Sequence, residues 1–350
     1  MTPLRFATPG QARVLLVGGT SAGHLAPLVA VAEALEQLEP GIELSFVCSD
    51  KPSDKEFLAQ EQRTCTTLPL PRPNLSLPFT FTNAFALSLR ILKKEQPHVV
   101  FSKGSAVSVP LCLAARLKGI PIILHESDGV MGRANQLVSH IALQTLSGPV
   151  IGNPVRARIT QGRKEDGFRI TGFTGTKPVL LVMGGSQGAR AINECIVTNL
   201  DSLLQRFDII HLTGAGKSTA TQRPGYYTTE FGSDVLPHLY AITTLAVSRA
   251  GGGSIAELTA CTIPSILVPI KGLAGDHQVK NAEAAEKTGA CIVVAQERLT
   301  DLPPLLESLR NDAGRLQTMR DACRYAAKPE AARLIAETIV QSVAQKTSRA

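Results

Sequence analysis

Glycine-rich segments recur at matching positions in the two halves of this chain. They span residues 18–24, 184–190 and 251–257. The first two follow the apolar runs 14–17 and 179–183 and precede helical patterns, so each is predicted to be a turn from a strand into a helix. Backbone N–H groups at such a turn bind phosphate, and glycine lets the anion approach them. Two such turns predict two diphosphates, or one diphosphate ligand held between two domains.

Short apolar, β-branched runs alternate with helical patterns along the chain, which is typical of βαβ units and parallel sheets. The 350 residues are enough for two cores at ~150 residues each. Each half is therefore predicted to form a doubly wound α/β domain. The predicted strands are residues 13–18, 43–48, 98–101 and 121–124 in the first half, and 178–183, 208–212, 245–248, 265–268 and 290–294 in the second.

A dense run of turn-forming residues at 147–154 separates the two halves, so we place the domain boundary just after it. This predicts an N-terminal domain over residues 1–156 and a C-terminal domain over residues 157–329. The remaining segment, residues 330–350, contains a predicted helix that could pack on either domain.

The composition excludes several classes of protein. With 44% hydrophobic and 19% charged residues, the chain is predicted to be globular and soluble rather than disordered. Seven scattered cysteines without zinc spacing indicate reduced thiols in the cytoplasm. Neither a signal-type segment nor an apolar stretch of the ~20 residues that span a membrane is recognised.

The net charge of +7 indicates either an acidic partner or simple solubility. Nucleic acid is not an expected partner, because no long basic run or nucleic-acid motif accompanies the charge.

The first turn differs from the common nucleotide-binding motifs. It lacks the lysine and hydroxyl of a P-loop and the spacing of a nicotinamide-binding turn, which argues against ATP hydrolysis and hydride transfer. His24 opens the next helix, where an imidazole can be a general base, a donor to an anion or a structural group. Asp128 follows the predicted strand 121–124, at an edge where ligands of open α/β sheets bind. No Asp-x-Asp pair is present, so no metal cofactor is expected.

In the second half, Ser186 and Gln187 lie inside the second turn, where hydroxyl and amide groups can bond a phosphate. Arg190 could form a salt bridge or clamp a phosphate, and the sequence does not decide. Residues 254–257 match a capping box, in which Glu257 only closes its own helix. A carboxylate at the mouth of a parallel sheet also binds a ribose diol, but the residues alone favour the cap.

Residues 77–94 concentrate apolar side chains beside a basic end. This pattern fits shallow docking on an anionic membrane. A core-facing helix whose final cations complement its dipole also explains it, and the residues alone favour that helix. The side chains in question are Phe79, Phe81, Phe85, Arg90, Lys93 and Lys94.

The ordered motifs resemble those of the MurG family of bacterial peptidoglycan glycosyltransferases over about residues 14–281. The resemblance implies a GT-B fold, with two Rossmann-like domains facing across a cleft and a final helix returning to the N-terminal domain. It also implies inverting, cofactor-free and metal-independent transfer of GlcNAc from UDP-GlcNAc to lipid I, giving lipid II. The implied location is the cytoplasmic face of the cell membrane, on its anionic inner leaflet. The motifs are residues 18–24 with Pro27; 101–104 with 108–110; 125–128 with Gly132, Ala134 and Asn135; 152–156; 184–190; 249–257; and 275–278 with 281–282.

The resemblance also implies roles for single residues. His24 is our first choice of general base and Asp128 the second. The residues 79–94 resemble the family's membrane-facing patch, which reverses the preference for a core-facing helix. Ser105 replaces a glycine that is usual in the family. The donor would contact Arg156 and Ser186 at its phosphates, Glu257 at the ribose and Gln278 at the sugar, with Gln187 and Gly188 nearby. The acceptor diphosphate would lie on Gly18, Gly19, Thr20, Ser21, Ala22 and Gly23.

Two other functions stay open. An isomerase similar to UDP-GlcNAc 2-epimerase uses a like pair of domains, but it needs neither an acceptor diphosphate site nor a lipid patch. A non-catalytic nucleotide-sugar-binding subunit is the alternative from another class. Turnover with donor alone, and then with lipid I, separates the three.

Overall fold

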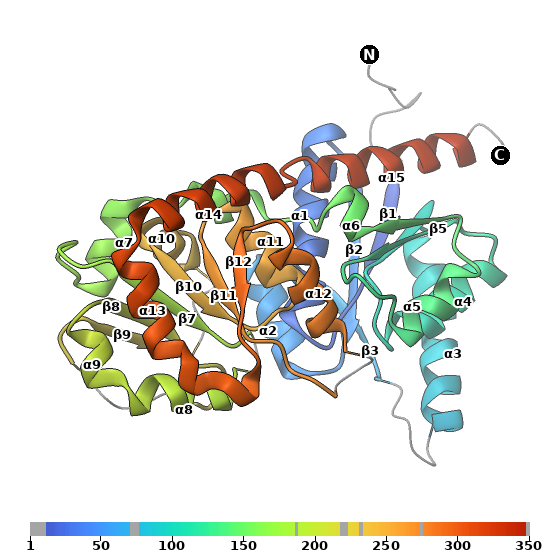
Figure 1. Ribbon diagram of the computed structural model, residues 1–350. Coiled ribbons are helices and arrows are strands. Elements are labelled where there is room, and N and C mark those ends of the chain that lie inside the picture. Colours follow the sequence, from blue (N-terminus) through green and yellow to red (C-terminus); the bar gives the residue numbers. More distant parts are fainter. Residues whose placement is uncertain are drawn as a thin grey trace. The chain divides into compact units, whose positions relative to one another are not determined.

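The computed structural model describes residues 12–70, 77–185, 188–217, 223–230, 234–272 and 276–347. The chain divides into two compact units (Figure 1). Asp128–Val130 cluster with the second unit, although they lie inside the predicted N-terminal domain. The first unit comprises Met1–Ser127, Met131–Arg156 and Pro329–Ala350, and the second comprises Asp128–Val130 and Ala157–Lys328.

The first unit is built on a six-stranded parallel sheet with the order β3-β2-β1-β4-β5-β6. This is the Rossmann order, and the direction of winding reverses between β1 and β4. The strands are β1 (Arg13–Val17), β2 (Glu43–Ser49), β3 (Cys65–Leu68), β4 (Val99–Ser102), β5 (Ile122–Glu126) and β6 (Gln144–Ser147). The helices are α1 (Ala22–Leu38), α2 (Pro52–Gln60), α3 (Leu77–Glu95), α4 (Ser108–Leu117), α5 (Arg133–Ser139), α6 (Gly148–Ile151) and α15 (Ala331–Thr347).

The second unit repeats this plan with the parallel order β12-β11-β10-β7-β8-β9, which reverses between β7 and β10. The strands are β7 (Val179–Met183), β8 (Asp208–Leu212), β9 (Tyr226–Thr229), β10 (Leu245–Ser248), β11 (Ser265–Leu267) and β12 (Cys291–Val293). The helices are α7 (Lys164–Thr171), α8 (Arg190–Thr198), α9 (Leu200–Leu204), α10 (Leu236–Ile242), α11 (Gly252–Ala260), α12 (His277–Glu286), α13 (Leu302–Asn311) and α14 (Ala313–Ala326), with 3₁₀ turns η1 (Ala157–Gln161) and η2 (Gln296–Asp301). The predicted pair of doubly wound Rossmann-like domains is confirmed.

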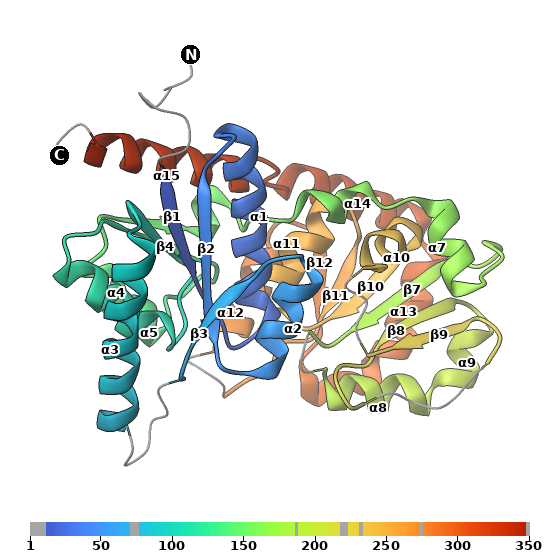
Figure 2. The same ribbon diagram turned by 180° about the vertical axis from the view of Figure 1, so that it is seen from behind.

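Strand β1 shows why the apolar runs are continuous. Val14 and Leu16 join a core with α1 and α15, whereas Leu15 and Val17 join another with α3 and α4. Because successive side chains of a strand point to opposite faces, a strand covered on both faces must be apolar throughout. Figures 1 and 2 both show α15 beside α1 in the first unit.

Strands β3, β6 and β9 were not predicted from the sequence. All three are edge strands, and each contains polar residues in place of an apolar run. In the described part of the chain, no helix has the length and apolarity to cross a membrane.

Candidate functional site

The glycine-rich segments follow the strands that flank the reversal point of each sheet. The segment after β1 leads into α1, the segment after β7 leads into α8, and the segment after β10 leads into α11. The predicted strand-to-helix turns are therefore confirmed. Ligands of open α/β sheets bind where the winding reverses, at the carboxyl ends of the strands. Each unit thus has a candidate ligand site at this place.

The first turn is held tightly by a buried carboxylate. A Cβ on Gly19 would lie 2.8 Å from Asp54 Oδ2, so only glycine fits. Thr20 has φ +75°, which is unusual for a β-branched residue. Its N–H donates to Asp54 Oδ2 at 2.7 Å, and Ser49 Oγ donates to the same oxygen at 2.6 Å. The Thr20 amide is therefore bound to Asp54, whichever other amides of the turn a diphosphate uses.

His24 lies on the first turn of α1, and its Nδ1 is 3.2 Å from Ser21 Oγ. Enclosure of the ring by protein, followed by the charge of Lys103, lowers the pKa of His24 to about 4, against smaller opposing effects of Glu126 and Asp54. The ring is therefore neutral at pH 7. A neutral imidazole can accept a proton, and a bound anion would raise the pKa.

Lys103 directly follows β4, and Glu126 is the last residue of β5. Both side chains are buried. Lys103 Nζ donates to Ser127 Oγ, and Asn135 Nδ2 donates to Glu126 Oε2 at 2.7 Å. A Cβ on Gly18 would lie 3.3 Å from Lys103 Cβ, so the lysine stem lies directly beside the first turn.

The loop after β4 has two successive residues with positive φ. Gly104 has φ +89° and Ser105 has φ +85°. A Cβ on Gly104 would overlap the Asn135 amide at 2.1 Å. Ser105 keeps a backbone conformation that favours glycine, and its buried Oγ has no hydrogen-bond partner.

The second turn is as tight as the first. A Cβ on Gly184 would lie 2.1 Å from the Ala189 nitrogen, and a Cβ on Gly188 would lie 2.2 Å from the Thr213 carbonyl oxygen. Ser186 and Gln187 lie outside the described residues. Arg190 forms an exposed pair with Glu194, with Nε 2.7 Å from Oε1. The sequence left open whether Arg190 forms a salt bridge or clamps a phosphate, and the structure shows the salt bridge.

Glu257 is not a capping residue, so the capping-box interpretation was wrong. Helix α11 begins at Gly252 with Gly251 as its N-cap, which places Glu257 well inside the helix. Its Oε2 accepts a hydrogen bond from the Tyr240 hydroxyl at 3.0 Å. The carboxylate is half-buried near the reversal point of the second sheet, where a ribose diol can be bound.

Gln278 is the second residue of α12, and its Oε1 accepts a hydrogen bond from Ile270 N–H at 3.3 Å. Because the carbonyl oxygen is engaged, the amide group would meet a ligand as a donor.

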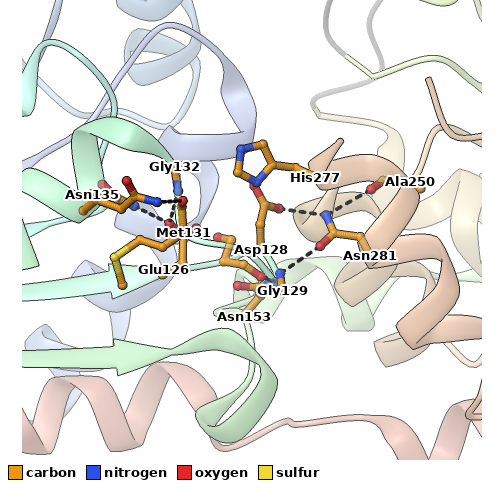
Figure 3. Close-up of polar contacts among 12 residues, drawn as sticks. Glu126, Asp128, Gly129, Met131, Gly132, Asn135, Asn153, Ala250, His277 and Asn281 are labelled. Carbon is orange, nitrogen blue, oxygen red and sulfur yellow. Dashed lines mark hydrogen bonds and ion pairs between the residues drawn. The ribbon is translucent and has the colours of Figure 1, made fainter. Parts of the chain in front are cut away.

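Asp128 is bound by helix α12 of its own unit (Figure 3). Asn281 Nδ2 donates to Asp128 Oδ1 at 2.8 Å, and Asn281 Oδ1 accepts from Gly129 N–H at 3.0 Å. His277 Nδ1 lies 3.9 Å from Asp128 Oδ2. The two candidate bases, His24 and Asp128, therefore belong to different units.

Arg156 is a buried residue of the first unit. Its guanidinium pairs with the equally buried Glu61 and lies 5.5 Å from the centre of the Phe57 ring. A donor phosphate would have to compete with Glu61 for it, and its role toward the donor stays a prediction.

The proposed membrane patch is divided by burial. Phe79 is 81% exposed near the start of α3, and the cations Arg90, Lys93 and Lys94 are exposed toward its end. Phe81 and Phe85 instead pack partly against the core of the first unit. Of the three phenylalanines, Phe79 has the most exposed side chain.

Sequence reasoning missed residues that lie against the candidate binding residues. Asp54 and Tyr240 have no motif around them, and Lys103 lies within the motif 101–104 but was not predicted to have a role. Among the residues that the structure describes, no cluster of three or more His, Cys, Asp or Glu could hold a metal ion.

Comparison with family models finds two matches. Residues 14–147 match the glycosyltransferase family 28 N-terminal domain, and residues 179–339 match the glycosyltransferase family 28 C-terminal domain. The chain is 33% identical over 315 residues to the UDP-N-acetylglucosamine--N-acetylmuramyl-(pentapeptide) pyrophosphoryl-undecaprenol N-acetylglucosamine transferase of Clostridium botulinum, covering 83% of this chain and 88% of the relative. The protein of the same name from Clostridium kluyveri is 35% identical over 84% of this chain and 89% of its own length.

Solved structures share the fold over most of the chain. Acinetobacter baumannii MurG superposes with a TM-score of 0.71 at 24% identity, covering 94% of this chain and 99% of that protein. UDP-GlcNAc 2-epimerase from Neisseria meningitidis, bound to UDP-GlcNAc, superposes with a TM-score of 0.65 at 15% identity, covering 94% and 100% of the two chains. Fold alone therefore does not separate a transferase from an isomerase.

Proposed function

The chain belongs to the glycosyltransferase family 28 transferases named above, and from this premise we propose that it moves GlcNAc from UDP-GlcNAc to N-acetylmuramyl-(pentapeptide) pyrophosphoryl-undecaprenol, that is, from the donor to lipid I. The observation that carries the proposal is that transferases with this activity are 33–35% identical to the chain across both units. The epimerase shares only the fold, at 15% identity.

The second unit would bind the donor. N–H groups of Gly184 and Gly185 and the N-terminus of α11 suit the diphosphate, which gains negative charge as UDP leaves. Glu257 would accept hydrogen bonds from the ribose hydroxyls, and the Gln278 amide would donate to the sugar. No metal ion takes part in this proposal.

The first unit would bind the acceptor. Its diphosphate would lie on the turn 18–23, near the positive charge of Lys103. The acceptor 4-hydroxyl forms the new bond to the anomeric carbon, while the bond to UDP breaks and leaves its electrons on the phosphate oxygen. The hydroxyl proton passes to Nε2 of His24, because Nδ1 already contacts Ser21. Attack from the face opposite UDP gives a β-linkage.

The pKa of about 4 makes His24 a weak base before the acceptor binds. The acceptor diphosphate would raise that pKa through its negative charge, so the base would gain strength in the complex that needs it. His24→Ala should lower kcat by ~10² with little change in donor KM. If Asp128→Asn abolishes kcat and His24→Ala mainly raises acceptor KM, the two roles are exchanged.

The lipid acceptor places the reaction at a membrane surface. We propose peripheral docking at the cytoplasmic face through Phe79 and the exposed cations of α3.

The test of the function is turnover with each substrate alone and with both. We expect UDP release only when donor and lipid I are both present. Epimerisation with donor alone would support the isomerase, and binding without turnover would support the non-catalytic subunit.

A further inference from the structure

A tyrosine hydroxyl in the second unit is directed at the carboxylate that the proposed function assigns to the ribose. Tyr240 lies on α10 and is only 2% exposed. Its hydroxyl donates to Glu257 Oε2 at 3.0 Å and lies 3.8 Å from Met183 Sδ, at the end of β7. Tyr240 therefore lies between the strand that leads into the second glycine turn and the helix that carries Glu257.

A phenylalanine would fill the same core position without the hydroxyl. A buried hydroxyl needs a partner, and here the hydroxyl donates to a half-buried carboxylate. A carboxylate has about four acceptor positions. The Tyr240 bond uses one of the positions on Oε2. Because the ring is buried, the bond restrains the position of Glu257 Oε2.

We propose that Tyr240 is a positioning residue that holds Glu257 for the 2′- and 3′-hydroxyls of a nucleoside diphosphate. This inference rests on the proposed function, because it needs Glu257 to bind the ribose. Two hydroxyls can bond one carboxylate together only when its plane is set correctly. Without the tyrosine hydroxyl, the glutamate must be ordered by the ligand itself, and this ordering weakens binding.

The test compares binding of UDP with that of 2′,3′-dideoxy-UDP, by calorimetry on the full chain. The wild-type protein should prefer UDP by about tenfold or more, since the dideoxy ligand leaves the carboxylate without its partners. Tyr240→Phe should weaken the binding of UDP by about tenfold and the binding of the dideoxy ligand by less than about twofold. Donor KM should rise in parallel while kcat stays within about twofold.

Tyr226→Phe is the matched control. Tyr226 is a buried tyrosine of the same unit whose hydroxyl bonds His211 Nδ1 at 2.8 Å instead of a carboxylate. The control should leave the preference for UDP unchanged. In a double-mutant cycle, Tyr240→Phe should add little to the loss already caused by Glu257→Gln, because both changes act on one contact.

Equal weakening of both ligands by Tyr240→Phe, or an unchanged preference for UDP, would overturn the proposal. Loss of preference in the Tyr226→Phe control would overturn it as well. A variant that unfolds is replaced by Glu257→Gln alone, which must abolish the preference if the carboxylate binds the diol. The proposed function fails separately, if wild-type protein binds UDP with this preference yet transfers no sugar to lipid I.

Discussion

Replacing Asp54 by alanine should loosen the first glycine turn. The change removes the acceptor for Thr20 N–H and Ser49 Oγ, which lie 2.7 and 2.6 Å from Oδ2. Hydrogen bonds to a charged group contribute ~1.5–3 kcal/mol each. If Thr20 relaxes from φ +75°, the loss of backbone strain offsets ~1–2 kcal/mol of this destabilisation. The free energy of unfolding should therefore fall by about 3 kcal/mol, measured by urea denaturation.

The same variant should impair acceptor binding selectively, because the turn that it loosens is the proposed diphosphate site. Acceptor KM should rise by about tenfold, while donor KM stays within about twofold. Ser49→Ala is the control, because it removes one donor and leaves the Thr20 bond, so it should cost ~1.5–3 kcal/mol and leave acceptor KM unchanged. A stability loss below about 0.5 kcal/mol, or an equal rise in both KM values, would refute the reasoning.

Four further predictions follow from the described residues. Ser105→Gly should raise the free energy of unfolding by about 1 kcal/mol, because it relieves φ +85° and a buried hydroxyl without a partner; a lower urea midpoint would contradict this. Lys103→Met should raise the pKa of His24 and move the acidic limb of kcat/KM to higher pH, because the unprotonated base is then lost sooner as pH falls; an unmoved limb would show that the lysine charge does not act on the base. Phe79→Ser with Lys93→Gln and Lys94→Gln should reduce sedimentation with anionic vesicles and spare activity on a short-chain soluble acceptor, whereas unchanged sedimentation would exclude this docking surface. Transfer in EDTA should stay within about twofold of the untreated rate, and a complete loss restored by Mg²⁺ would falsify the metal-independent mechanism.

Most of the fold was predictable because the central strands are covered on both faces. A strand such as β1 must be apolar at every position, so it is visible as a continuous run in the sequence. The edge strands β3, β6 and β9 escaped prediction because their sequences are interrupted by polar residues, whereas β12, also an edge strand, is apolar and was predicted. Their pairing depends on the neighbouring strand, which no local pattern reveals.

The candidate site was predictable only where its chemistry is local. Glycine turns and His24 lie within one short segment, so their spacing is informative. Asp54 reaches Thr20 from 34 residues away, and Asn281 reaches Asp128 from 153 residues away. Contacts between residues so far apart in the sequence leave no local or periodic pattern from which they could be predicted. The misassigned cap at Glu257 has a different cause, since the helix begins two residues before Ser254.

The anomeric configuration of the product tests the central claim most directly. The protein should be incubated with UDP-GlcNAc and a lipid I analogue, and the new linkage examined by proton NMR. Inverting transfer predicts a β-linked GlcNAc on the 4-hydroxyl of the muramyl sugar, with one UDP released for each bond formed. An α-linkage would contradict attack from the face opposite UDP. Conversion of the donor to its 2-epimer, without any linkage to the acceptor, would contradict transfer itself.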